Sequence, residues 1–443
     1  MPGCGGNVAS VPASGSPVRW RYGAGGDVAI PLAVRDEALY AAAAPGLVAL
    51  DPVTGDELWV ALPGSRPHWV EPTAESIFVA MNEQVAAVDG DTGQERWRAE
   101  VGGLPAGVPA LGTSIVTIGT MAGDIVGFDL ASGTERWRYT LGAWVASGPT
   151  VVTDVVYAGY AGYAGDEPGT VVALGATDGR ERWRATLGDD LAATPTIAHE
   201  TVFVVGRNGI YALDSATGEE RWRIETWFNR YAYPTTPVVV DDTVYVGAGD
   251  GALYALDAAT GAEQWVSSAP ELSGYVGSEP LIVGDVFVFV TQLGGSVAAV
   301  DAATGQLHWS YPLSGTEFWP AVVPAPASDS VYTTIGSDLA ALDPVTGEER
   351  WCLTLDSFAD QLLADDEAVY IGTGNTGMIA VATDAVPGTP AATPDAARSS
   401  DAGVRSGDGQ APSETTSSWT TTSKPPTSGS VVRRGRTFAI WSR

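Results

Sequence analysis

Few residues of this 443-residue chain have the types and spacing that catalysis requires. The three histidines, His68, His199 and His308, lie far apart and lack metal-ligand spacing. The two cysteines, Cys4 and Cys352, are too few for a disulfide framework or a zinc site. The sequence contains neither a recognisable Ser-His-Asp arrangement nor a glycine-rich phosphate loop. We therefore predict no catalytic and no metal-binding residue.

Aromatic side chains are the residues best suited to a function. Several follow a recurring Trp by about seven to eleven residues, and others lie nearby with an arginine. Exposed aromatic rings beside a few polar groups are typical of recognition surfaces. The alternative is that these rings fill the bases of the structural units. The predicted binding face consists of Trp69, Trp144, Trp227, Arg230, Tyr231, Tyr233, Tyr275, Phe318 and Trp319.

The recurring Trp belongs to a motif that the chain repeats eight times. A Gly lies four residues before each Trp, and in seven copies an Asp lies eight residues before it; the fourth copy has Gly175 there. The steps between successive Trp residues are 38 to 46 residues, a period typical of repeat architectures and propeller blades. The motif residues that we predict to be structural are Asp51, Trp59, Asp89, Trp97, Asp129, Trp137, Trp183, Asp214, Trp222, Asp257, Trp265, Asp301, Trp309, Asp343 and Trp351.

One copy indicates how a unit folds. In the segment 252–265, an apolar run ends at Asp257, turns through Thr260 and Gly261, and re-enters a strand that carries Trp265. Asp bonds backbone amides just ahead of it and Gly accepts a positive φ, so the motif closes a hairpin. Two more β-rich runs precede it, which gives four short antiparallel strands per unit. Radial stacking buries both faces of such sheets, and the Trp would fill the seam between neighbours.

These residues resemble the tryptophan-docking motif of the PQQ-type β-propellers, Ala-x-Asp-x-x-Thr-Gly-x-x-x-Trp. Six copies match every fixed position, among them 49–59 and 341–351, while the third departs at Gly127 and Ser132 and the fourth at Gly175 and Asp178. The resemblance covers residues 18–386 and implies an all-β propeller of four-stranded antiparallel blades. That family is mostly eight-bladed, so we expect eight. However, 18–22 looks like a lone outer strand and 361–381 like a unit that lacks one, so a literal count allows nine.

Composition suggests the environment. The formal charge is −30, and Lys424 is the only lysine beside 22 arginines. Scattered acids with almost no lysine resemble proteins of halophilic archaea, whose charges are screened at high ionic strength; a receptor for cationic partners is the alternative. Such charge argues against a nucleic-acid partner, and no apolar stretch is long enough for a transmembrane helix.

The two ends have a different composition. Residues 1–17 read as a flexible linker, and Gly3-Cys4-Gly5 looks like the end of a lipobox, so Cys4 is a candidate for lipidation. On this hypothesis a signal sequence would lie upstream of Met1; the alternative is an ordinary N-terminal cysteine. Residues 387–443 form a tail rich in Ser, Thr and Pro, which we predict to be disordered, and it becomes basic at Arg433, Arg434, Arg436 and Arg443. We interpret it either as a glycosylated stalk or as a frameshifted end of the gene.

We therefore expect a non-catalytic, extracytoplasmic binding or scaffold propeller similar to the BamB type, monomeric, without a cofactor, and with unknown protein partners. One alternative is a quinoprotein dehydrogenase, for which the resemblance would imply PQQ, Ca²⁺, a catalytic Asp and, in one branch, adjacent cysteines that this chain lacks. Another is a carbohydrate-binding surface module. Without a signal sequence the protein would be cytoplasmic.

Overall fold

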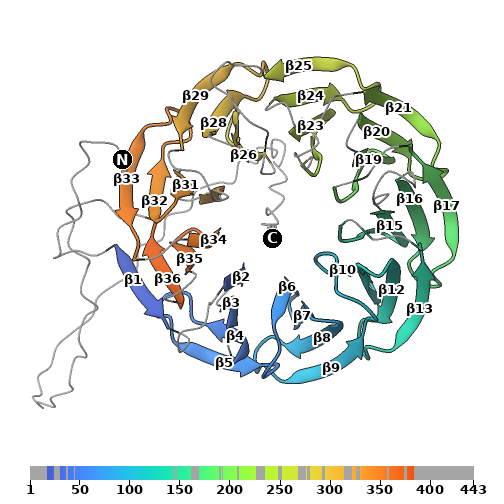
Figure 1. Ribbon diagram of the computed structural model, residues 1–443, viewed down its shortest axis with the longest axis horizontal. Coiled ribbons are helices and arrows are strands. Elements are labelled where there is room, and N and C mark those ends of the chain that lie inside the picture. Colours follow the sequence, from blue (N-terminus) through green and yellow to red (C-terminus); the bar gives the residue numbers. More distant parts are fainter. Residues whose placement is uncertain are drawn as a thin grey trace, which may run out of the picture.

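The computed structural model is a ring of nine four-stranded antiparallel sheets arranged as propeller blades around a central axis (Figure 1). The structure describes residues 17–23, 30–35, 38–43, 45–142, 145, 147–160, 169–188, 191, 193–206, 209–225, 235–247, 252–267, 276, 280–291, 295–313, 322–325, 330–356, 359–373 and 377–383.

The strands of each blade are given from the innermost to the outermost. The first three blades contain β2 (Ile30–Arg35), β3 (Ala38–Ala43), β4 (Gly46–Leu50) and β5 (Glu57–Ala61); β6 (Pro67–Pro72), β7 (Ser76–Met81), β8 (Gln84–Asp89) and β9 (Glu95–Glu100); and β10 (Ala110–Leu111), β11 (Ile115–Gly119), β12 (Asp124–Asp129) and β13 (Glu135–Thr140). The next three contain β14 (Thr150–Val152), β15 (Val155–Tyr160), β16 (Thr170–Gly175) and β17 (Glu181–Thr186); β18 (Thr196–Ala198), β19 (Thr201–Val205), β20 (Gly209–Asp214) and β21 (Glu220–Glu225); and β22 (Val238–Val240), β23 (Thr243–Gly247), β24 (Leu253–Asp257) and β25 (Glu263–Ser267). The last three contain β26 (Leu281–Val283), β27 (Val286–Val290), β28 (Ser296–Asp301) and β29 (Leu307–Pro312); β30 (Val322–Ala325), β31 (Ser330–Ile335), β32 (Asp338–Leu342) and β33 (Glu349–Thr354); and β34 (Ala359–Ala364), β35 (Ala368–Thr373), β36 (Gly377–Ala382) and β1 (Val18–Tyr22).

The repeated Asp shapes the hairpin between the third and fourth strands of a blade. In the second blade, the Asp89 carboxylate accepts the backbone N–H of Thr92 at 3.0 Å and its hydroxyl at 2.8 Å. The N–H of Gly93 bonds the Asp89 carbonyl at 3.0 Å, and Gly93 has a φ of +70°. Glycine adopts this left-handed conformation without the Cβ clash that other residues meet. The turn therefore requires these residue types.

Each such glycine also forms the floor on which the Trp of the preceding blade lies. A Cβ placed on Gly93 would be 2.7 Å from the Trp59 ring, and the Trp59 indole donates to the Gly90 carbonyl at 3.1 Å. Only a residue without a side chain allows this approach, so the repeat fixes the distance between blades. The stacked pairs are Trp20 on Gly55, Trp59 on Gly93, Trp97 on Gly133, Trp137 on Gly179, Trp183 on Gly218, Trp222 on Gly261, Trp265 on Gly305 and Trp309 on Gly347.

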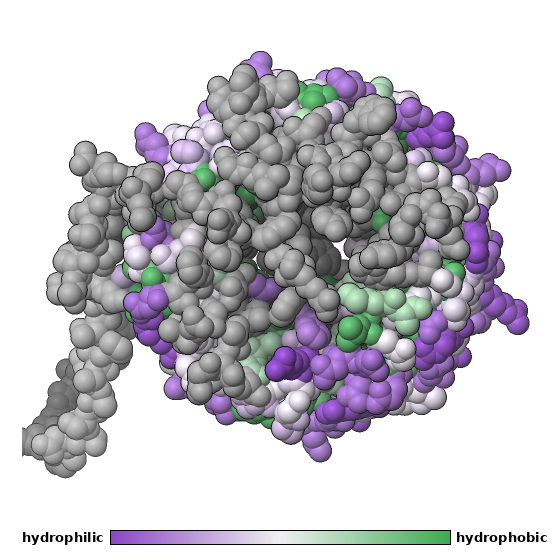
Figure 2. All heavy atoms as spheres, in the orientation of Figure 1, coloured by the Kyte–Doolittle hydropathy of each residue, from purple (hydrophilic) through white to green (hydrophobic). Residues whose placement is uncertain are grey.

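Charged side chains surround the Trp residues on the outer strands, and hydrophilic residues crowd the rim of the described blades (Figure 2). In β9, Arg96 bonds Asp89 of the same blade at 2.7 Å, and Arg98 bonds Glu95 at 2.7 Å. Such exposed pairs contribute little stability individually. Their main effect is to cover the outer edge of sheets such as this one with charge.

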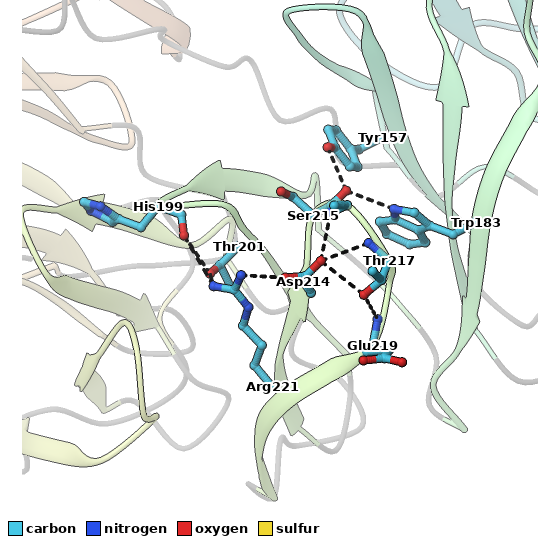
Figure 3. A network of polar contacts seen from close by, with 10 residues as sticks. Tyr157, Trp183, His199, Thr201, Asp214, Ser215, Thr217, Glu219 and Arg221 are labelled. Carbon is cyan, nitrogen blue, oxygen red and sulfur yellow. Dashed lines mark hydrogen bonds and ion pairs between the residues drawn. The ribbon is translucent and has the colours of Figure 1, made fainter.

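A second aromatic supports the Trp at several seams. Around Asp214, the Ser215 carbonyl accepts both the Trp183 indole at 2.9 Å and the Tyr157 hydroxyl at 3.2 Å, so two aromatic side chains of the fourth blade bond one acceptor of the fifth (Figure 3). Asp214 itself bonds Arg221 at 2.6 Å. This network belongs to the packing of the ring.

The blade count corrects the expectation of eight. Strand β1 pairs antiparallel with β36, with Trp20 opposite Ala380, so the two terminal fragments combine into one complete blade. The Trp20 indole then donates to the Pro52 carbonyl at 2.9 Å and docks like seven of the eight motif Trp residues, all except Trp351. The preference for eight blades came from the family average, whereas every unit of this chain, including the composite one, has a place in the ring.

The seam behind Trp351 is closed by other means, since the composite blade carries the chain ends where other blades have the motif hairpin. Trp351 packs with Tyr332 and Ile379 in one buried cluster. Arg21 of β1 bonds Asp356 at 3.1 Å, and the Tyr332 hydroxyl donates to the Thr383 carbonyl at 3.1 Å. Apolar packing and polar contacts thus join the eighth blade to the composite ninth blade without a docking glycine.

Cys352 on β33 is disulfide-bonded. The only other cysteine of the chain, Cys4, lies outside the described residues, as do the other parts of 1–16 and all of 384–443. No helix among the described residues is long and apolar enough to span a membrane.

Candidate functional site

Of the predicted aromatic face, the structure describes only Trp69. It lies on β6, the innermost strand of the second blade, which faces the centre of the ring (Figure 1). The remaining members of the face lie outside the described residues; they are Trp144, Trp227, Arg230, Tyr231, Tyr233, Tyr275, Phe318 and Trp319. Whether they join Trp69 stays a prediction.

Trp69 contributes to the packing of its blade and also to the surface of the protein. It pairs with Ala80 across the β6–β7 ladder and packs on the buried cluster around Phe78 and Trp97. It is only partly buried, so part of its surface remains open to solvent. Part of the Trp69 ring thus fills the base of its blade, and the other part is available at the surface.

Polar neighbours on the same segment give this position an amphipathic character. His68 lies beside Trp69 with ring centroids 5.8 Å apart, and Arg66 is exposed just before the strand. Glu71 is partly buried two residues beyond Trp69. We call Arg66, His68, Trp69 and Glu71 the β6 patch. An aromatic surface with a cation and a carboxylate is suited to binding, because it offers apolar area together with directional polar groups.

The protonation state of His68 follows from its surroundings. Burial lowers the pKa of His68 below its ordinary value, and the positive charge of Arg66 lowers it further. Both effects disfavour the charged form. At neutral pH the imidazole is therefore neutral and able to donate and accept hydrogen bonds.

The β6 patch lies on the most continuous part of the inner wall. Strands β34, β2 and β6 have six residues each, whereas β14, β18, β22 and β26 have three each and β10 has two. Arg35 of β2 donates to the Pro72 carbonyl at 2.7 Å, which ties the inner strands of adjacent blades. Sequence reasoning missed Arg35, because nothing in its local pattern predicts a partner on the next repeat.

The dehydrogenase alternative would need a cluster of oxygen ligands for Ca²⁺. Within this part of the chain, no three His, Cys, Asp or Glu side chains gather as a possible metal-binding group. The repeated Asp residues are instead engaged by hairpin amides and arginines, as at Asp89 and Asp214. They fit a structural role and do not fit a calcium-supported quinone, which requires a cluster of oxygen ligands.

Comparison with known proteins places the chain among propellers of this type. By sequence, residues 81–166 and 167–319 match the family described as outer membrane protein assembly factor BamB, and these ranges cover more than half of the chain. No curated protein matches the chain by sequence.

Solved structures share the fold. BamB from Moraxella catarrhalis is 18% identical with a TM-score of 0.55, over 72% of this chain and 98% of that one. The computationally designed Ika8 protein is 16% identical with a TM-score of 0.55, over 81% and 98%. A quinohemoprotein alcohol dehydrogenase from Comamonas testosteroni is 15% identical with a TM-score of 0.55, over 86% and 78%. At such identities the likeness concerns architecture alone.

Proposed function

Since the chain belongs to the PQQ-type β-propeller family described as outer membrane protein assembly factor BamB, we propose that it is a non-catalytic scaffold that binds other proteins. The observation that carries the proposal is the β6 patch, where a partly exposed Trp and an exposed Arg lie on one short segment of a continuous inner wall. Trp and Arg are the residues most enriched at the energetic centres of protein interfaces.

Rigidity supports the same proposal. Eight seams are held by Trp rings on glycines, and buried clusters run from blade to blade around the ring. A binding surface on such a support loses little conformational entropy when a partner docks. We restrict the proposal to protein binding and do not extend the outer-membrane role of the family description to this chain.

We further propose that the protein works outside the cytoplasm. The disulfide at Cys352 supports this location, since disulfides persist in oxidising compartments and are rare in reducing ones. A monomeric propeller in such a compartment would present the β6 patch to soluble or surface-bound proteins.

The test is partner capture by the full chain in molar KCl, followed by chemical cross-linking and mass spectrometry of extracts from the source cells. The test variants are Trp69→Ala and Arg66→Glu. Arg223→Glu is the matched control for the charge change, since Arg223 is 54% exposed on the outer rim. We expect a defined set of proteins to cross-link to wild type and to the control and to be lost from both test variants. Equal capture by all four proteins would refute the role of the β6 patch.

A further inference from the structure

The outer strand β5 differs from its counterparts in other blades. Strands β9, β13, β17 and β21 all carry Arg on both sides of the docking Trp, in the order Glu-Arg-Trp-Arg. In β5 the same positions are Leu58 and Val60, which are 51% and 38% exposed. Val53, in the hairpin of the same blade, is 57% exposed. Three of the eight large exposed hydrophobic residues in the described part of the chain thus lie on the outer edge of one blade.

This edge also lacks the protection found elsewhere on the rim. Strand β5 is terminal in the sheet β2-β3-β4-β5, so its outward backbone groups have no partner strand within that sheet. Edge strands are ordinarily blunted by charge, as Arg96 and Arg98 do on β9. A free, apolar edge is a template for the addition of a further strand.

The Trp on β5 is also more exposed than the Trp residues on the other outer strands. Trp59 is partly exposed, whereas Trp20, Trp97, Trp137, Trp183, Trp222, Trp265, Trp309 and Trp351 are 6–9% exposed. Carboxylates flank the apolar strip, because Asp56 and Glu57 are both exposed at the start of β5. The surface therefore suits an extended segment that is apolar and carries positive charge.

The chain contains such a segment in its own C-terminal part, outside the described residues. Residues 431–441 read Val-Val-Arg-Arg-Gly-Arg-Thr-Phe-Ala-Ile-Trp. The β-branched and aromatic residues favour a strand. The three arginines contrast with the formal charge of −30 for the whole chain and complement the acidic flanks of β5.

The connectivity permits the contact within one molecule. The last described residue, Thr383, follows β36 of the composite blade, and that blade touches the blade of β5 directly, since the Trp20 indole bonds the Pro52 carbonyl at 2.9 Å. The 47 residues from 384 to 430 would span about 35–40 Å as a random coil. Tethering at this range gives an effective concentration on the order of millimolar.

A second globular copy fits the edge less well. Strand β5 has five residues, and so short an edge buries far less than the roughly 1,200–2,000 Å² of a stable protein interface. A tethered strand needs no such area. We propose that residues 431–441 of this chain add to the free edge of β5 as a fifth strand of that blade and cover Leu58 and Val60.

Hydrogen exchange of the full chain in molar KCl tests this proposal. The test variant is Leu58→Arg with Val60→Arg, which gives β5 the Glu-Arg-Trp-Arg order of its sister strands and is therefore compatible with the fold. The control is Leu104→Arg, at an exposed residue (44%) outside β5. We expect the amides of 431–441 to exchange at least about tenfold more slowly than those of 411–422 in wild type and control, and at equal rates in the double variant.

Three results would overturn the proposal. The first is the absence of protection in wild type, and the second is protection that the double variant retains. The third is protection that rises with protein concentration, which would assign the strand to the tail of a second molecule.

Discussion

The spacing of the blades depends on glycines that no other residue can replace, and Gly305 provides the sharpest test. An added Cβ there would lie 2.3 Å from Cε3 and 2.6 Å from Cδ2 of Trp265, well inside a normal contact of about 3.5–4.0 Å. The ring would have to move, and the bond from its indole to the Ala302 carbonyl, 3.2 Å long, would weaken. Overpacking of this kind costs about 1–3 kcal/mol and the lost hydrogen bond about 1 kcal/mol.

Gly188 provides the matched control. Its φ is +67° against +69° for Gly305, but no atom lies within 4 Å of an added Cβ. Both Gly→Ala changes therefore share the left-handed backbone penalty of about 1–2 kcal/mol, partly offset by reduced freedom of the unfolded chain. We expect Gly305→Ala to be less stable than Gly188→Ala by about 2–4 kcal/mol, or a melting temperature about 3–5 °C lower for a ring of this size.

The assay is thermal unfolding in molar KCl, followed by Trp fluorescence and circular dichroism, with wild type and both variants side by side. Gly305→Ala should also shift the emission of the folded state to longer wavelength as Trp265 loses its packing. Equal melting temperatures for the two variants would refute the idea that Trp-on-Gly contact sets the seam.

Two other predictions concern protonation and the cysteines. The Arg partners and hairpin donors lower the pKa of Asp89, Asp129 and Asp214 to about 2, so their stabilisation is fully present above pH about 4 and is lost as the pH falls to 2. The melting temperature should therefore decrease between pH 4 and 2, by a small amount for each exposed pair, and a flat profile there would contradict the assigned bonds. Peptide mapping without reduction should recover Cys352 in a disulfide, for which Cys4 is the only intrachain partner; a lipid mass on the Cys4 peptide would instead support the predicted anchor.

The sequence predicts the propeller because its motif combines two local requirements, a turn and a seam between blades, that are both visible in the residues. Asp89 and Gly93 are needed for one turn, and Gly93 and Trp59 for one seam. Trp20 was recognisable as an outer-strand residue from its neighbours alone. The number of blades was not predictable in the same way, since it depends on whether β1 and β36 meet, which is a long-range pairing.

The candidate site is less visible in the sequence, because binding residues on connectors follow no period. The partial burial of Trp69 depends on how β6 packs against Phe78 and Trp97, and the bond from Arg35 crosses to the next blade. Likewise, the free edge at Leu58 and Val60 becomes apparent only when β5 is aligned with its structural equivalents. Comparison between repeats, more than any single motif, therefore identifies candidate functional positions in this chain.

The central claim is that this propeller acts by binding proteins and not through a quinone. The most direct measurement is a titration of pyrroloquinoline quinone into the full chain in molar KCl, with and without Ca²⁺, followed by intrinsic Trp fluorescence. We predict no saturable change beyond the optical absorption of the quinone, with the protein shown to be folded by circular dichroism. Saturable quenching that depends on Ca²⁺ would contradict the claim and favour a dehydrogenase.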